Sequence, residues 1–479
     1  MTVTSSPKQA PSLGWVLAIA SVSSLVVALD QLVVATALQT IRVDLHASIE
    51  SLEWTVNAFS LSLATLLIPG AQLGDRIGRK RTLTIGLSVF AVASAACALS
   101  PTIGLLLAAR VLQGAGGALI LPTALALLTG SVAPQRRGFA MGVFAAVMGL
   151  AVVCGPLIGG AVAQGFNWHW IFWINVPVIA AILPFAAIRL REAKGSPART
   201  DAPGIALLGA SIFGFVWGLV RSGPAGWGSA EVVGALVGAV ILLVMFVLWE
   251  LRVNEPMLPI RLFAIPSFGA GNLSTLLLTA SLFSTVFFFA QYLQIVLGYS
   301  PLEAGLRFLP WAVPMFFISP IAGRLQNRIG PRLWISIGLT LHCVGLLWLA
   351  AAAETHGSYT SGFLGALVVS GVGLAMAMPA QQNAVMGSVP PPSMGKAAGT
   401  FSTIRQMGGV VGVAITAAVF SAYGNDQSST AFAAGFSAAV SAAAVISFVG
   451  AVSGLFTRGS KPKQALSTPV EAVSEKVGV

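Results

Sequence analysis

Two charged residues, Asp30 and Arg110, lie inside long apolar stretches of the sequence. Asp30 belongs to the apolar run 14–38 and Arg110 to the run 103–130. An ionisable group surrounded by hydrocarbon is costly, so it is a functional candidate by default. Burial favours the protonated form of a carboxylate, which would let a proton and a cationic ligand compete for Asp30. We expect Arg110 to tune that competition.

The composition shows what kind of element must hold these residues. Of the 479 residues, 56% are hydrophobic and 9% are charged, and the mean hydropathy is +0.87. So little polar surface excludes a soluble globular protein of this size. Fourteen apolar runs are each long enough for a membrane-spanning helix. Because lipid cannot hydrogen-bond the backbone and alternating barrel strands are absent, the sequence predicts an all-α membrane protein with 14 transmembrane helices.

The positions of Lys and Arg predict how the chain is oriented. With the N-terminus on the cytoplasmic side, most of the 26 Lys and Arg residues fall in cytoplasmic loops and tails. Both termini are therefore expected in the cytoplasm, and the first apolar run is expected to be an uncleaved anchor. The net charge of +11 is then explained by anionic lipid rather than nucleic acid. The three cysteines all lie in apolar runs, which argues against a disulfide framework or a metal site.

Asp30 is the only carboxylate that this pattern places well inside a helix. Glu53 is expected just before the second helix, and three other glutamates are expected at helix ends or in loops: Glu250, Glu303 and Glu354. Counted from the outer ends of their helices at about 1.5 Å per residue, Asp30 and Arg110 both lie roughly 10–12 Å deep. We expect an ion pair or a water-bridged relay between them. The alternative is a static buried pair that only satisfies both charges.

Two segments occur twice, which indicates an internal duplication. The charged segment Gly74–Arg81 returns in degenerate form at Gln326–Arg332, and the glycine-rich segment Gly114–Ala118 returns at Gly371–Ala375. Helices 1 to 6 would then match helices 9 to 14, with helices 7 and 8 inserted between them. Parallel six-helix repeats are typical of transporters that alternate access to a central site. The expected units are a first six-helix bundle at residues 1–188 and a charged linker with the inserted helix pair at 189–262. A second six-helix bundle follows at 263–457, and a cytoplasmic tail at 458–479.

Three motifs, taken together at these helices, resemble the fourteen-helix drug:proton antiporter branch of the major facilitator superfamily along nearly the whole chain. The loop between helices 2 and 3 has Gly74-Asp75-Arg76-x-Gly78-Arg79-Lys80-Arg81. Helix 4 has Arg110-x-x-Gln113-Gly114, helix 5 has Gly155-Pro156-x-x-Gly159-Gly160, and helix 1 has Leu29-Asp30. The chain departs from the family pattern at four positions: Ala71, Ala151, His169 and Phe59. The resemblance implies the major facilitator fold, with two extra helices between two six-helix bundles.

The resemblance also implies roles for the motif residues. The loop motif would be a cytoplasmic gate, formed by Asp75, Arg76, Gly78 and Arg79, in which Asp75 contacts a neighbouring helix N-terminus and the arginines make alternating ion pairs. Its second copy has Asn327 in place of Asp75, so the first copy should dominate. The helix 5 motif would restrain leak, formed by Gly155, Pro156, Gly159 and Gly160. The simpler explanation for Gly159 and Gly160 is close helix packing.

One further charge and a set of polar and aromatic residues complete the candidate site. Arg405, in helix 13, is a candidate gate residue of the second half, or it snorkels to the interface. A pocket for lipophilic ligands needs apolar walls and a few polar groups. The candidates for substrate contact, besides Asp30, are Asn57, Phe59, Gln113, Phe287, Gln291, Tyr292, Trp311, Gln381 and Gln382.

The resulting hypothesis is a proton-coupled antiporter. It would export lipophilic, cationic drugs or antibiotics across the cytoplasmic membrane of a bacterium, as a monomer in the bilayer. No enzyme motif and no nucleotide or metal site is present in the sequence, so no cofactor and no nucleic acid is expected, and a proton gradient would supply the energy. Two alternatives stay open: a dedicated exporter of one metabolite or lipid, and a receptor or scaffold without transport.

Overall fold

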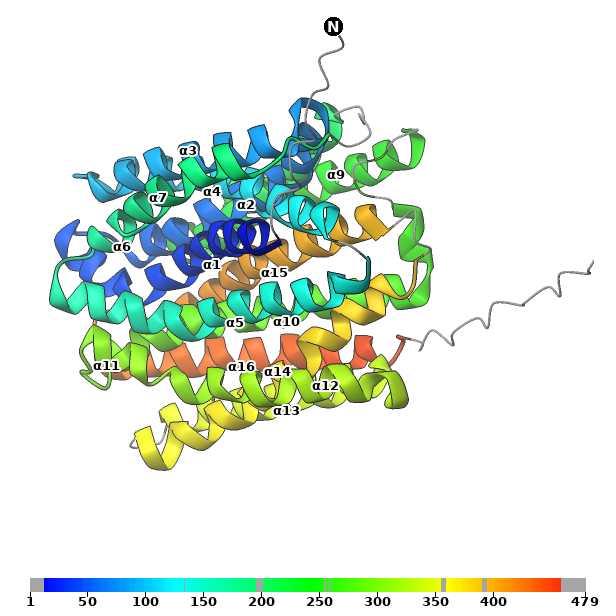
Figure 1. Cartoon of the computed structure of the whole chain (residues 1–479). Coiled ribbons are helices and arrows are strands. Elements are labelled where there is room, and N and C mark those ends of the chain that lie inside the picture. Colours follow the sequence, from blue (N-terminus) through cyan, green and yellow to red (C-terminus); the bar gives the residue numbers. More distant parts are fainter. Residues whose placement is uncertain are drawn as a thin grey trace, which may run out of the picture.

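The computed structural model describes residues 13–132, 134–194, 201–253, 256, 258, 260–354, 359–389 and 394–457. Several side chains inside four of its helices (α5, α8, α12 and α15), among them Pro156 and residues 323–329, lie outside this description, as does the expected tail 458–479. All regular secondary structure in the described part is helical (Figure 1). The all-α prediction is therefore confirmed.

The helices follow one another with short connections. In chain order they are α1 (Leu13–Asp44), α2 (Ile49–Ile77), α3 (Arg79–Ala98), α4 (Ile103–Ser131), α5 (Pro134–Gly165), α6 (Trp170–Trp173), α7 (Asn175–Arg189), α8 (Ala202–Ala225), α9 (Ala230–Arg252), η1 (Ile260–Ala264), α10 (Pro266–Ile295), α11 (Pro301–Leu306), α12 (Leu309–Ile329), α13 (Pro331–Glu354), η2 (Tyr359–Phe363), α14 (Leu364–Met386), α15 (Met394–Tyr423) and α16 (Ser429–Gly454).

The long helices correspond to the predicted membrane spans. Within the described residues, twelve spans are long and apolar enough to cross a membrane, and α6 and α7 together form one of them. The helices α5, with 32 residues, and α12, with 21 residues, complete the set of fourteen. A helix of 20 residues spans about 30 Å, the thickness of a bilayer core, so each of these helices has the required length.

The packing of the first half is repeated in the second half. In the first half α1 packs on α5, α2 and α3 pack on α4, and α3 packs on α7. In the second half α10 packs on α15, α12 and α13 pack on α14, and α13 packs on α16. Figure 1 shows the two sets one above the other, with α1, α5, α10 and α15 between them. The helices α8 and α9 pack on each other, and α8 also contacts α2 and α15.

The two copies of the charged segment form the same turn. The first lies between α2 and α3, where Gly78 has φ +112°, and the second lies between α12 and α13, where Gly330 has φ +86°. Positive φ is readily adopted only by glycine. The duplicated motif thus places a glycine where the chain reverses direction between equivalent helices.

Polar contacts between the two halves gather at one end of the bundle, which we call the Arg42 end. Arg42 forms an ion pair with Asp426. The amide of Gln39 donates to Gln291 at 3.0 Å, and Gln294 donates to the carbonyl of Thr36 at 3.0 Å. We call the opposite end, with the first charged segment, the Asp75 end. The sequence predicts that the Asp75 end faces the cytoplasm.

Candidate functional site

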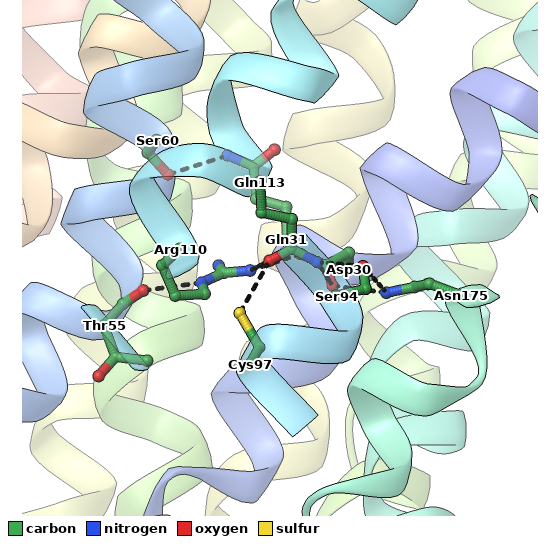
Figure 2. Close-up of polar contacts among 9 residues, drawn as sticks. All are labelled: Asp30, Gln31, Thr55, Ser60, Ser94, Cys97, Arg110, Gln113 and Asn175. Atoms are coloured by element: carbon green, nitrogen blue, oxygen red, sulfur yellow. Dashed lines mark hydrogen bonds and ion pairs between the residues drawn. The ribbon is translucent and has the colours of Figure 1, made fainter. Parts of the chain in front are cut away.

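Asp30 lies in the middle of α1 and is enclosed by side chains from other helices. Its Oδ2 atom is 2.5 Å from Nη1 of Arg110 in α4. Its Oδ1 atom accepts hydrogen bonds from the amides of Gln113 in α4 and Asn175 in α7, both at 2.8 Å. Figure 2 shows Asp30 between Arg110 on one side and Asn175 on the other. The predicted pairing of Asp30 with Arg110 is therefore direct.

Arg110 is held in place by contacts with two helices and an aromatic ring. Its Nε atom donates to the carbonyl of Thr55 in α2 at 3.0 Å, and Nη1 also donates to Oε1 of Gln113 at 2.7 Å. The guanidinium carbon lies 4.3 Å from the centre of the Phe59 ring, within the range of a cation–π interaction. The Arg110 side chain therefore joins α1, α2 and α4.

Two polar residues at this site, Asn175 and Ser94, are not among the sequence candidates. The hydroxyl of Ser94 in α3 accepts hydrogen bonds from Gln113 at 2.9 Å and Asn175 at 3.4 Å. Asn175 is a carboxamide inside an otherwise apolar run, which is the signal that could have selected it. Ser94 gives no such signal, because serine is common in membrane helices.

The site surrounds the Asp30 carboxylate with groups that stabilise its charge. Three hydrogen-bond donors and one full positive charge stabilise the ionised form of Asp30, and bonds to charged groups are the stronger class. A proton on Asp30 would remove the charge that Arg110 neutralises, so protonation should release the guanidinium. Protonation would thus remove the charge-assisted bond that links α1 to α4.

The predicted gate residues lie together at the Asp75 end. Asp75 and Arg79 form an ion pair at 2.9 Å, and Arg76 lies in the last turn of α2. The backbone N–H of Arg79 donates to the carbonyl of Ala193 at 2.9 Å. The acid at the N-terminus of α3 is Glu192, which is not among the residues predicted from the sequence. Its carboxylate accepts the N–H groups of residues 80 and 81 at 3.0 and 3.2 Å, where the helix dipole favours a negative charge.

The glycines of the α5 motif lie where α5 crosses other helices. A Cβ atom at Gly155 would lie 2.7 Å from Cβ of Leu32 in α1. A side chain at Gly159 would overlap Val33 and Thr36 of α1, and one at Gly160 would overlap Pro301 of α11. Pro156 lies in α5 between these glycines. These glycines permit close packing within the first half and against the second half.

The other candidates for substrate contact are distributed over both halves. Apart from Gln382, which is exposed, all are buried, and Gln113 contacts Asp30 directly. Gln291 bonds Gln39 at the Arg42 end, and Trp311 donates to Ser370 at 2.8 Å. Three more, Phe287, Tyr292 and Gln381, lie in α10 and α14, and Arg405 lies in the middle of α15. The structure thus brings Gln113 into the Asp30 site and leaves the second-half candidates in another group of helices.

The expectation that Glu53 precedes the second helix is wrong. The helix α2 begins at Ile49, capped by the Ser48 hydroxyl, which accepts the N–H of Ser51. Glu53 therefore lies in the second turn of α2, and its side chain is buried. A polar cap decides where this helix begins, whereas the apolar run begins several residues later. Asp30 is consequently not the only carboxylate inside a predicted span.

Comparison with protein families decides what kind of molecule holds this site. Residues 20–270 and 271–477 match the model of the Major Facilitator Superfamily. The chain belongs to the Major Facilitator Superfamily. As a member of this superfamily it is a multi-pass membrane transporter and not an enzyme, which confirms both predictions.

Several curated members of the superfamily are similar to this chain. The tetracenomycin C resistance and export protein of Streptomyces glaucescens is 35% identical over 397 residues, 82% of this chain and 73% of the relative. The cephamycin export protein CmcT of Amycolatopsis lactamdurans is 34% identical, with 83% of each chain covered. The multidrug efflux pump LfrA of Mycolicibacterium smegmatis is 32% identical, over 88% of this chain and 83% of the relative. These relatives are bacterial export proteins, consistent with the predicted plasma membrane location.

Solved structures show the same superfamily fold. A bacterial homologue of the human lysosomal transporter Spinster, in an inward-facing and unoccupied conformation, aligns with a TM-score of 0.67 and 19% identity, over 94% of this chain and 98% of its own. The peptide transporter POT, in complex with sulfate, aligns with a TM-score of 0.66 and 16% identity, over 93% of this chain and 96% of its own. At this identity, the likeness concerns the fold alone.

Proposed function

We propose that this transporter exports lipophilic, cationic drugs or antibiotics across the cytoplasmic membrane in exchange for protons. The observation that carries the proposal is the ion pair between Asp30 and Arg110, buried among four helices of the first half. The names of the similar export proteins support the direction of transport and the class of substrate. The protein would work as a monomer in the bilayer, without a cofactor or nucleic acid.

In this mechanism Asp30 carries the coupling proton. While Asp30 is ionised, Arg110 holds α1 and α4 together through a charge-assisted hydrogen bond. A proton that reaches Asp30 cancels the charge, and Arg110 keeps its contacts to Thr55 and Gln113. The helices can then change their packing, which would switch access from one side of the membrane to the other.

The gate motif and the α5 glycines would control that switch. The ion pair between Asp75 and Arg79 lies at the end where α2 turns into α3. The crossing of α5 with α1 and α11 lies toward the Arg42 end. We infer that the Asp75–Arg79 pair acts as the cytoplasmic gate, and that the close packing of α5 limits proton leak.

The test is proton movement in proteoliposomes loaded with a pH-sensitive dye. Adding an exported drug should move protons through the wild type and not through Asp30→Asn, because an amide cannot be protonated at these pH values. The matched control is Asp44→Asn on the same helix, where an amide oxygen can still accept the 2.7 Å hydrogen bond of Trp168. Unchanged drug-driven proton movement in Asp30→Asn would remove Asp30 from the coupling mechanism.

The breadth of transport distinguishes the main proposal from a dedicated exporter. Similar proteins include one named for multidrug efflux and others named for single antibiotics. A drug-susceptibility panel in a host without its own pumps, with wild type and Asp30→Asn, separates the two. Resistance to several unrelated cations supports multidrug export, and resistance to one compound supports a dedicated exporter. Binding without any proton-driven flux in proteoliposomes would favour a receptor or scaffold.

A further inference from the structure

We propose that Glu53 and Asn57 in α2 form a second ligand site, where Glu53 exchanges its proton for the cationic group of a substrate. This inference rests on the proposed export of cations and names the group that contacts the positive charge. The site is separate from the Asp30 site. Under this proposal Glu53 exchanges its proton for the cation, and Asp30 couples protonation to the conformational change.

Glu53 is a carboxylic acid without a partner in the described part of the protein. Its side chain is 3% exposed, and it makes no hydrogen bond or ion pair with any described residue. An isolated ionised carboxylate in such surroundings is very costly, so the group is expected to hold a proton when no cation is present. A cation bound against it would remove that cost and stabilise the ionised form.

Asn57 supplies an independent observation that points to a ligand at the same place. It follows Glu53 by one helical turn, so the two side chains share a face of α2. Asn57 is 0% exposed, and neither its Nδ2 nor its Oδ1 atom has a hydrogen-bond partner. A buried amide with both ends unpaired is rare, because each unmade hydrogen bond leaves a desolvated polar group uncompensated. A bound polar group would satisfy it.

The same face of α2 continues toward α1. Ser60, one further turn along, accepts a hydrogen bond from the amide of Gln31 at 3.3 Å. Figure 2 shows this Ser60–Gln31 contact beside the Asp30 network, and Thr55 of the same helix against Arg110. The polar row of Glu53, Asn57 and Ser60 therefore runs from near the Arg42 end to the neighbourhood of the Asp30 site without joining its ion pair.

Asp30 itself is poorly suited to bind a substrate cation in this arrangement. Its two oxygens are engaged by Arg110, Gln113 and Asn175. A cation would have to displace a guanidinium there. At Glu53 a substrate cation displaces only a proton. The carboxylic acid and the cation form a carboxylate–cation pair, and one proton is released to water, so charge and atoms balance.

Arg42 and Asp44 of α1, which lie at the same end as Glu53, are engaged by Asp426 and by the indole N–H of Trp168. Most other charged groups on the helices packed against α2 are also engaged elsewhere or lie at another depth, whereas the nearby negative charge of Glu50 further disfavours ionised Glu53. Arg110 of α4 pairs with Asp30 of α1, and Arg221 of α8 pairs with Glu231 and with Glu50, the acid one turn before Glu53. At about 1.5 Å per residue, Arg405 lies about 27 Å from the Tyr423 end of α15, whereas Glu53 lies about 6 Å from the start of α2. Both of these helix ends are at the Arg42 end. The basic residues that begin α3 lie at the Asp75 end.

The experiment measures binding and proton release together, with tetraphenylphosphonium as a permanently charged probe. Purified protein in weakly buffered detergent solution is titrated with the probe while the pH is recorded. We expect the wild type to release protons on binding. Glu53→Gln should bind the probe about tenfold more weakly, a change of about 1.4 kcal/mol, and release none. Glu53→Asp should restore release, and Asn57→Leu should weaken binding.

The matched control is Glu303→Gln, the same substitution at an acid of α11 whose carboxylate already accepts the backbone N–H of Ser300. It should leave binding and proton release unchanged. A folded Glu53→Gln protein that binds the probe and releases protons like the wild type overturns the inference, and so does a wild type that does not bind the probe.

Failure of this inference can be told from failure of the proposed function. If proton-driven export of other drugs persists while probe binding is independent of Glu53, only the second site is refuted. If Glu53-dependent binding and proton release occur but no proton gradient drives export of any drug, the proposed function is refuted and the site stands.

Discussion

Arg110 and Asp30 lie in direct contact, with Nη1 2.5 Å from Oδ2, and each side chain is 1% exposed. Water therefore cannot solvate either charge in this arrangement, and each residue is the counter-charge of the other. Such a pair contributes little against an apolar replacement of both partners, but loss of one partner leaves a buried charge uncompensated. The consequences for stability and for transport can be separated by mutation.

Arg110→Met should destabilise the protein by about 3–5 kcal/mol, because Asp30 then loses its counter-charge. Asp30→Asn combined with Arg110→Met should recover much of that loss, since neither charge remains. Thermal or denaturant unfolding in detergent measures both. Equal destabilisation in the single and the double variant would show that Arg110 acts through packing, for instance on Phe59, rather than through its charge.

Reversal of the charge at Asp75 should slow transport more than it weakens drug binding. The ion pair with Arg79 is partly exposed, so its contribution to stability should be only about 0.2–1 kcal/mol. Asp75→Lys should lower the maximal export rate several-fold with little change in binding affinity. The exchange Asp75→Arg with Arg79→Asp keeps an i,i+4 pair and should recover part of the rate. Equal maximal export rates in the wild type and Asp75→Lys would show that Asp75 does not act in a gate.

Gly159→Leu should destabilise the crossing of α5 and α1, because its side chain would overlap Val33 and Thr36. Overpacking of this kind costs about 1–3 kcal/mol. Gly234→Ala in α9 is the control, since no atom lies within 4 Å of the added methyl group; it should be neutral or stabilising. Unfolding in detergent compares the two, and proton leak in proteoliposomes should rise for Gly159→Leu only. A Gly159→Leu protein as stable and proton-tight as the wild type would contradict this packing role.

Glu303 should make stability depend on pH at the Arg42 end. The backbone N–H of Ser300 donates to its carboxylate at 2.9 Å and holds the pKa of Glu303 below its ordinary value of 4.5. A lowered folded-state pKa stabilises the protein above the ordinary value, and this contribution is lost as the pH falls through the folded-state pKa.

Glu303→Gln should therefore unfold at a lower temperature than the wild type at pH 7, and the difference should disappear in strongly acidic solution. Ser300→Ala removes the other half of the same capping box, so the double variant should show less than the sum of the single effects. A difference that is constant with pH would mean that the carboxylate charge does not take part.

Hydropathy was sufficient to predict the helices, because spanning helices need long apolar runs whatever their neighbours are. It was less reliable at helix ends. The Ser48 cap begins α2 at Ile49, outside the apolar run, and so places Glu53 inside the helix. At the N-terminus of α3 the sequence missed a long-range contact instead, because the acid there is Glu192, more than a hundred residues away in the chain.

The sequence by itself determined the superfamily, the number of long helices, their duplication, and the common depth of Asp30 and Arg110. These properties follow from composition, from repeated motifs and from the constant rise of a helix. Only the tertiary structure decided which side chains meet at that depth. Ser94 and Asn175 join the Asp30 site because α3 and α7 pack beside α1 and α4. Glu53 is buried, but no described group forms a hydrogen bond or ion pair with it. Such contacts depend on rotation and packing of whole helices, which local sequence does not encode.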